Sequence, residues 1–418
     1  MHFLRIFYHK KTTFLFFFFL LLNGCYIVKK VDFKNPIDTK TKRIEKQIIK
    51  QFHIKDMGLY ATNNFNSSRI NDFYKLNDST VCVLIKPENL PINKSPYYAF
   101  KTWSNSPKSI YYSFKYPKSF NHRYVPKIKH NNTWNIIDST KVFKTNTSYS
   151  IKLDVSKNPI IVASQEIQSS NDVKRWFTSL LNNKDFARIK SCGKSKLGRD
   201  IPVLDIYKGS KKNKEIIVLL TRQHPPEVTG YYAFQSFLST ILNNNELSDQ
   251  FLNKYRILAF PIVNPDGVDL GHWRHNAGGV DTNRDWSKYN QPEIRNITRF
   301  ITKTSKLSNS KIIIGLDFHS TYEDVFYTNE SIPTANKLTP FFVNKWFNSL
   351  EKNIPNYKVN EKSSNSKEPV SKGWFLYGHN AVGITYEIGD TTPKDFINLK
   401  GRVSATEMMK ILVENNIN

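Results

Sequence analysis

Two short segments of the sequence carry side chains of the types that bind a divalent metal ion. His224 and Glu227 stand three residues apart, shortly after the apolar run at 214–220, and His319 directly follows a second apolar run at 311–318. Two imidazole nitrogens and one carboxylate, with water in the fourth position, form a catalytic zinc set, whereas structural zinc usually takes four protein ligands. The alternative is that His224 caps a helix and His319 is an ordinary polar loop residue.

The segment 264–286 is dense in groups that bind anions. It contains Arg274, Asn283 and Arg284. Two guanidinium groups beside an amide suit both a carboxylate and a developing oxyanion. Asp281 lies close to them in the chain and could hold a metal-bound imidazole by its second ring nitrogen.

These candidate residues lie at or after the ends of continuous apolar runs that alternate with helical patterns. The runs have the composition of buried strands and lie at 201–207, 214–220, 255–263, 311–318 and 381–388. Helical patterns lie between several of them, at 231–242, 292–301 and 340–352. The alternation predicts an α/β domain with a mostly parallel or mixed sheet flanked by helices, whose ligand crevice lies at the carboxyl ends of the strands. Glu387 lies at the end of the last run, where it could deprotonate a zinc-bound water.

The region before residue 165 has a different sequence pattern. Between residues 56 and 164, short runs rich in Val, Ile, Tyr and Phe are separated by clusters of Asn, Ser, Pro and Lys. Short strands at regular spacing with turn signals between them predict a small all-β sandwich. We therefore expect a β-sandwich domain at 56–164, with a packing or recognition role, followed by a catalytic domain at 165–418.

The N-terminus has the pattern of a processing signal. A basic start precedes an apolar run at 14–22, which is too short to cross a bilayer core of about 30 Å at about 1.5 Å per residue. The sequence Leu-Asn-Gly-Cys that ends at Cys25 resembles the lipobox of bacterial lipoproteins. This resemblance implies a signal peptide at 1–24, a lipidated Cys25, a polar tether at 25–55 and an extracytoplasmic place in the bacterial cell envelope. The alternative is an ordinary signal peptide with an incidental cysteine.

The composition narrows the function classes. A length of 418 residues suggests two or three domains, and three cysteines cannot form a disulfide scaffold. The 61 Lys and Arg residues exceed the 35 Asp and Glu residues, which gives a net charge of +26. This charge could indicate a nucleic-acid binder, but the Lys residues are scattered and form no Arg-rich stripe. We expect no nucleic-acid partner.

In order and content, the motifs together resemble the zinc carboxypeptidase family. The family has His-x-x-Glu, Asn-Pro-Asp-Gly, an Arg followed by an Asn-Arg pair, His-Ser and a final Glu, and all five occur here in that order, the last as Glu387. The short sequence separation between Arg274 and Asn283 resembles that in the cytosolic carboxypeptidase branch of the family and its bacterial relatives. That branch also carries a β-sandwich before the catalytic domain.

The resemblance implies one zinc ion per chain, bound by His224, Glu227 and His319. It further implies that Glu387 is the general base and that Arg274 stabilises the oxyanion.

It also implies how the substrate is held. Asn283 and Arg284 would bind the terminal carboxylate of a peptide, and Asp281 would orient His224. Lys372 stands where the family sorts C-terminal side chains. A buried ammonium there would favour a C-terminal Asp or Glu, and the alternative is that Lys372 points into solvent.

One family feature has no counterpart. Digestive members place a Tyr in a mobile loop before the base, and the matching stretch at 358–372 contains none. Tyr357 and Tyr377 lie near that stretch in the sequence, and neither is assigned to the role.

The sequence therefore predicts a membrane-anchored zinc metallocarboxypeptidase that acts on peptides with a free C-terminal carboxylate. One alternative is a deacylase or peptidoglycan-peptide amidase on the same zinc scaffold. A second is a non-catalytic surface-binding lipoprotein. The intact ligand set and Glu387 argue against the second.

Overall fold

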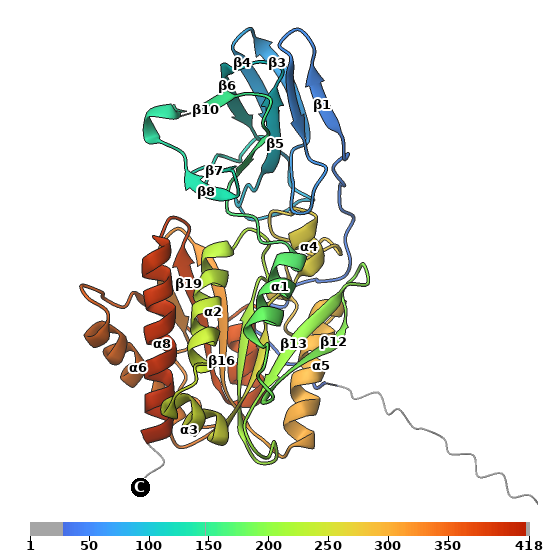
Figure 1. Ribbon diagram of the computed structural model, residues 1–418. Helices are drawn as coiled ribbons and strands as arrows, with labels where there is room; N and C mark the ends of the chain where they lie inside the picture. The colour runs from blue at the N-terminus through green and yellow to red at the C-terminus, as the bar shows by residue number, and fades with distance from the viewer. Residues whose placement is uncertain (1–27, 147, 415–418) are drawn as a thin grey trace, which may run out of the picture.

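The computed structural model describes residues 28–146 and 148–414. Figure 1 shows a β domain placed on one end of a larger α/β domain, with the first described residues running down beside both. The predicted signal peptide at 1–24 and Cys25 lie outside the described residues. Within the described ranges, no helix is both long enough and apolar enough to cross a membrane.

The β domain consists of two sheets. The six-stranded sheet has the order β1-β2-β5-β11-β7-β8 and the five-stranded sheet the order β3-β4-β6-β10-β9. The strands are β1 (Gln51–Ile54), β2 (Leu59–Thr62), β3 (Asp72–Asn77), β4 (Thr80–Leu84), β5 (Ala99–Ser104), β6 (Lys108–Lys115), β7 (Lys127–His130), β8 (Thr133–Ile136), β9 (Val142–Lys144), β10 (Tyr149–Val155) and β11 (Ile160–Ala163). Alternate residues of strands such as β6 are buried, as expected for a sheet with one face on a core. Strand β1 lies before the predicted domain start at residue 56.

The α/β domain is built on a mixed eight-stranded sheet of order β12-β13-β15-β14-β16-β19-β17-β18. The strands are β12 (Ala187–Lys194), β13 (Asp200–Ile206), β14 (Glu215–Thr221), β15 (Tyr255–Phe260), β16 (Ile312–Thr321), β17 (Val325–Thr328), β18 (Glu361–Ser363) and β19 (Val382–Gly389). Strands β15, β14, β16 and β19 are parallel to their neighbours in this group. Their near-complete burial explains the continuous apolar runs in the sequence. The predicted fold class is confirmed.

Helices cover both faces of this sheet. They are α1 (Ser170–Leu180), α2 (Val228–Ile241), α3 (Glu246–Lys254), α4 (Pro265–Asp269), α5 (Pro292–Leu307), α6 (Thr339–Asn353), α7 (Ser371–His379) and α8 (Lys394–Glu414). Helices α2 and α8 lie side by side over the sheet. Helix α7 packs on β16 at Gly315, where a Cβ atom would lie 2.2 Å from the ring of Phe375. The absence of a side chain at Gly315 therefore brings this helix close to the strand that carries His319.

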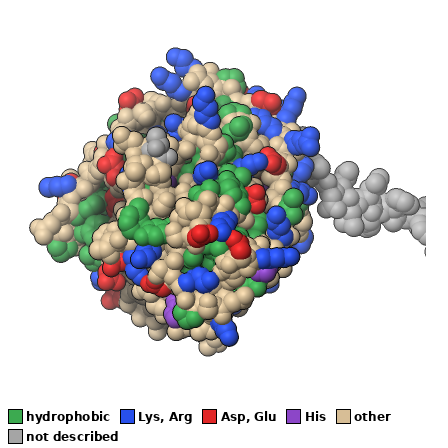
Figure 2. All heavy atoms as spheres, turned by 90° about the horizontal axis from the view of Figure 1, so that it is seen from above, with side chains coloured by type: hydrophobic (Ala, Val, Ile, Leu, Met, Phe, Trp, Pro, Cys, Tyr) green, Lys and Arg blue, Asp and Glu red, His purple; other side chains and the backbone are tan. Residues whose placement is uncertain are grey.

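The first described residues lie along the α/β domain and form what we call the N-terminal strap (residues 28–50). The amide of Asn35 donates to the carbonyl of Lys367 at 2.8 Å, and the side chain of Gln291 donates to the carbonyl of Thr39 at 2.6 Å. The described part of the predicted tether is therefore held against the catalytic domain over much of its length. Seen from the side of the β domain, Lys and Arg side chains are scattered among apolar and uncharged ones (Figure 2).

Candidate metal centre and active-site cleft

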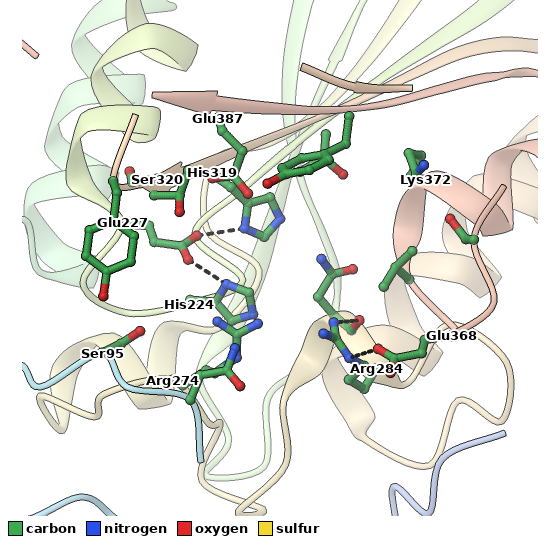
Figure 3. Close-up of a pocket in the computed structure, with 18 of the residues that line it drawn as sticks. Ser95, His224, Glu227, Arg274, Arg284, His319, Ser320, Glu368, Lys372 and Glu387 are labelled. Atoms are coloured by element: carbon green, nitrogen blue, oxygen red, sulfur yellow. Dashed lines mark hydrogen bonds and ion pairs between the residues drawn. The ribbon is translucent and has the colours of Figure 1, made fainter. Parts of the chain in front are cut away.

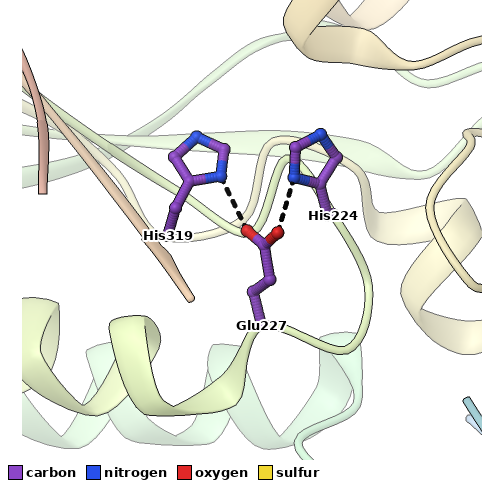
Figure 4. Close-up of side chains that lie close together, drawn as sticks. All are labelled: His224, Glu227 and His319. Atoms are coloured by element: carbon purple, nitrogen blue, oxygen red, sulfur yellow. Dashed lines mark hydrogen bonds and ion pairs between the residues drawn. The ribbon is translucent and has the colours of Figure 1, made fainter. Parts of the chain in front are cut away.

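Three side chains from different elements converge on one point. His224 follows β14, Glu227 stands at the N-terminal end of α2, and His319 lies near the end of β16. Nδ1 of His224 lies 2.8 Å from one oxygen of Glu227, and Nδ1 of His319 lies 2.6 Å from the other (Figure 4). All three residues are buried, and their ligand atoms lie within 4.8 Å of one another. The structure brings together the three residues predicted to bind zinc.

The start of α2 is held tightly against β16, and this contact places Glu227. A Cβ atom on Gly230 would lie 2.1 Å from the carbonyl oxygen of His319, so only glycine allows the helix this close. The hydroxyl of Ser320 accepts hydrogen bonds from the Gly230 amide at 2.9 Å and from the Thr229 hydroxyl at 2.8 Å. The helix end and the strand therefore hold their two ligands at a set separation.

The outer ring nitrogens of both histidines face carboxylates. Nε2 of His224 lies 2.9 Å from Asp281, and Nε2 of His319 lies 2.9 Å from Asp317. Such partners hold a metal-binding imidazole in one tautomer and orientation. Both Nδ1 atoms then face inward, and with the Glu227 carboxylate they form a donor set that fits zinc.

Asp281 also contacts Arg274, so one carboxylate joins two predicted site residues. Its second oxygen accepts a hydrogen bond from Arg274 Nε at 2.7 Å. Burial alone would raise the pKa of Asp281, but Arg274 and His224 hold it well below its usual range. The carboxylate therefore stays ionised, and it fixes the Arg274 guanidinium beside the metal site.

Glu387 lies on β19, in the register position opposite His319 on β16. Its side chain lies close to His319 in Figure 3. Burial raises the pKa of Glu387 to about 8, and Glu227 adds to this effect while His319 and Arg274 oppose it. Among the described residues, no group forms a hydrogen bond with Oε2 of Glu387.

The two buried glutamates differ in their proton affinity. Burial would also raise the pKa of Glu227, but His224 and His319 lower it well below the usual range. One carboxylate is thus kept charged, as a ligand must be, and the other binds a proton readily. Divergent pKa values of this kind separate the roles of neighbouring carboxylates in hydrolases.

A cleft of about 800 Å³ opens in front of these residues. Asn283 and Arg284 line it, together with Ser95 and Arg123 from the β domain. Figure 3 shows the metal-binding side chains on one side of the cleft and Arg284, Glu368 and Lys372 on the opposite side. A ligand that reaches both sides would therefore meet the metal site at one end and cationic groups at the other.

Arg284 is paired within the protein. Its Nε lies 2.8 Å from a carboxylate oxygen of Glu368, an exposed residue of the loop before α7. The side-chain oxygen of Asn283 accepts a hydrogen bond from the amide of Ser371 at 2.9 Å. That contact connects the predicted carboxylate-binding pair to the start of α7.

Lys372 is buried, so the alternative that it points into solvent is wrong. Its side chain lines the cleft, and its ammonium donates to the carbonyl oxygens of Thr328 and Ser364, each at 2.6 Å. Burial lowers the pKa of Lys372 to about 8, and Glu330 opposes the shift. The ammonium is therefore mostly protonated at pH 7 and has one N–H beyond the two donated to these carbonyls.

Two buried polar residues of the site were missed by the sequence interpretation. Asp317 faces His319, and Gln223 and Ser371 both donate to its Oδ2 atom. Gln223 also accepts a hydrogen bond from the ring nitrogen of Trp286 at 3.0 Å. The alternation of side chains along a strand could have revealed Asp317, because residues two apart share a face. Nothing local in the sequence indicates the role of Gln223.

The tyrosines near the cleft differ from those considered in the sequence. Tyr322 and Tyr327 line the cleft. Tyr357 packs against Phe396, and Tyr377 packs against Phe33 of the strap. Strand β17 pairs with β19 so that Tyr327 lies opposite Thr385, another residue of the cleft wall.

Comparison with known proteins agrees with this geometry. The family model described as zinc carboxypeptidase matches residues 173–406, which is more than half of the chain. The chain belongs to the zinc carboxypeptidase family. His224, Glu227 and His319 form the zinc site typical of this family.

Similar proteins come from several organisms. An uncharacterized protein of Zymomonas mobilis subsp. mobilis is 26% identical over 220 residues, which cover 50% of this chain and 55% of that protein. Cytosolic carboxypeptidase 6 of Caenorhabditis elegans is 28% identical over 119 residues, 28% of this chain and 25% of that protein. The chain spans about half, or less, of the length of these curated relatives. A metallo-carboxypeptidase from Burkholderia cenocepacia shares the fold with a TM-score of 0.71 at 14% identity, over 86% of this chain and 99% of that one.

Proposed function

We propose that this zinc carboxypeptidase family member hydrolyses the C-terminal peptide bond of peptides. The observation that carries the proposal is the arrangement of the cleft. The predicted carboxylate-binding pair, Asn283 and Arg284, lines the same cleft as His224, Glu227, His319 and Glu387. A peptide whose terminal carboxylate contacts Arg284 would present its last amide bond to the metal-binding side of the cleft.

Each group in the cleft has a separate role in the proposed hydrolysis. A bound zinc ion supplies a Lewis acid and lowers the pKa of water at the site. As a carboxylate, Glu387 accepts a proton from the attacking water and then delivers it to the leaving amine; burial strengthens it as a base, because its pKa is raised. Arg274, fixed by Asp281, offers its remaining N–H groups to the oxyanion that develops on the scissile carbonyl.

The opposite side of the cleft would select the C-terminal side chain. Lys372 places an ammonium among the cleft residues, close to neutral backbone groups. An Asp or Glu side chain would pair with this ammonium, whereas Lys or Arg would meet an unpaired like charge. We propose a preference for acidic C-terminal residues.

We further propose that the protein is a lipoprotein on an extracytoplasmic face of the bacterial cell envelope. The proposal rests on the apolar run at 14–22 and the lipobox-like Leu-Asn-Gly-Cys that ends at Cys25. A diacylated cysteine would hold the protein at a membrane without a spanning helix. The Cys25→Ser variant should then leave the membrane fraction. Unchanged fractionation together with an unchanged N-terminal mass would rule out the lipid anchor.

The enzymatic proposal is tested with purified full-length protein, metal analysis and defined peptides followed by mass spectrometry. We expect bound zinc and release of single C-terminal residues. Peptides amidated at the C-terminus are the matched control and should be cleaved far more slowly, because the amide offers Arg284 no charge. Zinc with cleavage only of acyl or cell-wall amides would indicate the deacylase or amidase alternative. Absence of both zinc and hydrolysis would indicate a binding protein.

A further inference from the structure

A buried carboxylate of the β domain lies against the backbone of the loop that carries Arg274. Glu88 follows β4 in the chain, and its side chain accepts hydrogen bonds from three consecutive backbone amides of the α/β domain. Oε2 accepts from Trp273 at 2.8 Å, and Oε1 accepts from Arg274 at 3.0 Å and from His275 at 2.6 Å. These amides otherwise have no place in a helix or strand, so Glu88 satisfies a stretch of backbone that would be left unpaired.

The charge of Glu88 is balanced within the same junction. Glu88 has no exposed surface, and the guanidinium of Arg69, also buried, interacts with it electrostatically. Burial alone would raise the pKa of Glu88, but His272, Arg69 and His275 lower it to about 2. The carboxylate is therefore ionised throughout the physiological range, and hydrogen bonds from N–H groups to an ionised acceptor are stronger than those to a neutral one.

The residue after Glu88 holds the same loop further along. The side chain of Asn89 contacts Nδ1 of His275 at 2.6 Å and donates to the carbonyl oxygen of Gly279 at 3.0 Å. The His275 ring therefore contacts the β domain through Nδ1. Figure 1 shows that the β domain sits directly on the end of the α/β domain that bears these loops.

Arg274 is thus held at both ends by two carboxylates. Glu88 binds its backbone amide from the β domain, and Asp281 binds its guanidinium Nε from within the α/β domain. A guanidinium on a long side chain points accurately only when both its backbone and its head are fixed. The β domain then contributes directly to the geometry of the cleft.

We propose that Glu88 is a positioning residue for Arg274, through which the β domain completes the active site. The inference rests on the proposed hydrolysis for the role of Arg274. Glu88 does not line the cleft and touches no reacting atom. It acts through the loop, and the β domain is needed for turnover even where it does not contact the substrate.

The test uses Glu88→Gln in the full chain. The side chain of Gln has the same shape as that of Glu, but one of its two oxygens is replaced by an NH₂ group. This NH₂ group cannot accept a hydrogen bond, so at least one of the three backbone N–H groups loses its acceptor. Tyr112→Phe is the matched control, because it removes one buried hydrogen bond in the same domain, with the hydroxyl of Thr102 at 2.8 Å, between strands β5 and β6 and away from this loop. If Glu88→Gln does not fold, Glu88→Asp takes its place in the same measurements. Asp keeps the negative charge, but its shorter side chain moves the carboxylate away from the loop by the length of one methylene group.

The first measurement needs no activity. Hydrogen exchange of the peptide that covers residues 272–276 should speed up about tenfold or more in Glu88→Gln, and remain as in the wild type in Tyr112→Phe. Unchanged exchange in Glu88→Gln, or equal acceleration in both variants, would overturn the proposal. If the wild type hydrolyses no peptide, the proposed function fails, and this measurement still decides whether Glu88 holds the loop.

The second measurement is a double-mutant cycle. Glu88→Gln should lower kcat about 10-fold to 100-fold with zinc content unchanged and KM within about twofold, because a displaced group costs turnover. In the Arg274→Ala background, the same change should alter kcat by less than about twofold, because its effect passes through Arg274. Additive losses in the double variant would show a general structural effect and overturn the positioning role.

Discussion

His319 and Glu387 are Cα partners on the neighbouring parallel strands β16 and β19. The zinc ligand His319 and the proposed general base Glu387 therefore lie on neighbouring strands of one sheet. A separation set by strand pairing varies little, because the strands lie a fixed distance of about 4.8 Å apart. The pairing brings together two residues that lie 68 positions apart in the sequence, as the proposed mechanism requires.

The role of Glu387 can be tested by Glu387→Gln. The amide has the same shape but cannot take a proton, so we expect zinc and fold to be retained and kcat to fall about 10²–10⁴-fold. Steady-state kinetics on a peptide substrate measure kcat, and metal analysis of the same sample measures the zinc content. A kcat near that of the wild type would exclude Glu387 as the base.

The zinc ligands can be tested one at a time. His224→Ala, Glu227→Ala and His319→Ala should each lose most of the bound zinc, because two remaining ligands make a weak site. His379→Ala is the control, since that ring packs against Trp374 at 4.4 Å and lies on α7. Full zinc occupancy in any of the three variants, by metal analysis after dialysis, would show that the residue is not a ligand.

Glu368 forms an ion pair with Arg284, the residue proposed to bind the substrate carboxylate. Because Arg284 Nε already contacts Glu368 at 2.8 Å, a peptide must compete with this carboxylate. Glu368→Ala should therefore lower KM about two- to fivefold and leave kcat nearly unchanged, in line with the modest strength of exposed ion pairs. Glu323→Ala, which breaks an exposed pair with Lys362, is the matched control. A raised KM in Glu368→Ala would instead show that the pair holds Arg284 in its active position.

The preference for acidic C-terminal residues should depend on pH. Burial lowers the pKa of Lys372 to about 8, so the side chain is an ammonium below pH 8 and a neutral amine above it. The ratio of kcat/KM for a C-terminal Glu peptide to that for the Gln peptide should be high at pH 7 and fall as the pH rises through 8. Lys372→Met should give a low ratio that does not change over this range. A wild-type ratio that is low at pH 7, or constant from pH 7 to 9, would exclude Lys372 as the selecting group.

Local sequence patterns were enough to place the central strands and several helices. The apolar run predicted at 214–220 is β14, Glu215–Thr221, and the run at 381–388 is β19, Val382–Gly389. The helical pattern at 292–301 is the first part of α5, Pro292–Leu307, which begins with a proline in its first turn. Each of these signals lies within a few residues of the element it specifies.

Other elements carry no such local signal. Strand β17 and the edge strand β18 are only four and three residues long, and all three residues of β18 are exposed. Helix α8 is buried on several sides, and its apolar residues do not form one stripe. Such elements form because neighbouring parts of the chain pack against them.

The same division holds for the site. Side-chain types and their motifs were enough to predict which residues can bind zinc and which can transfer a proton, because these capacities belong to the side chains themselves. The pairing of Glu387 with His319, the burial of Lys372, the contact of Glu368 with Arg284 and the contact of Glu88 with the loop of Arg274 became visible only in the folded chain. These relations join residues on separate elements or across loops. Packing and backbone pairing between those elements set them, and no local pattern in the chain records such contacts.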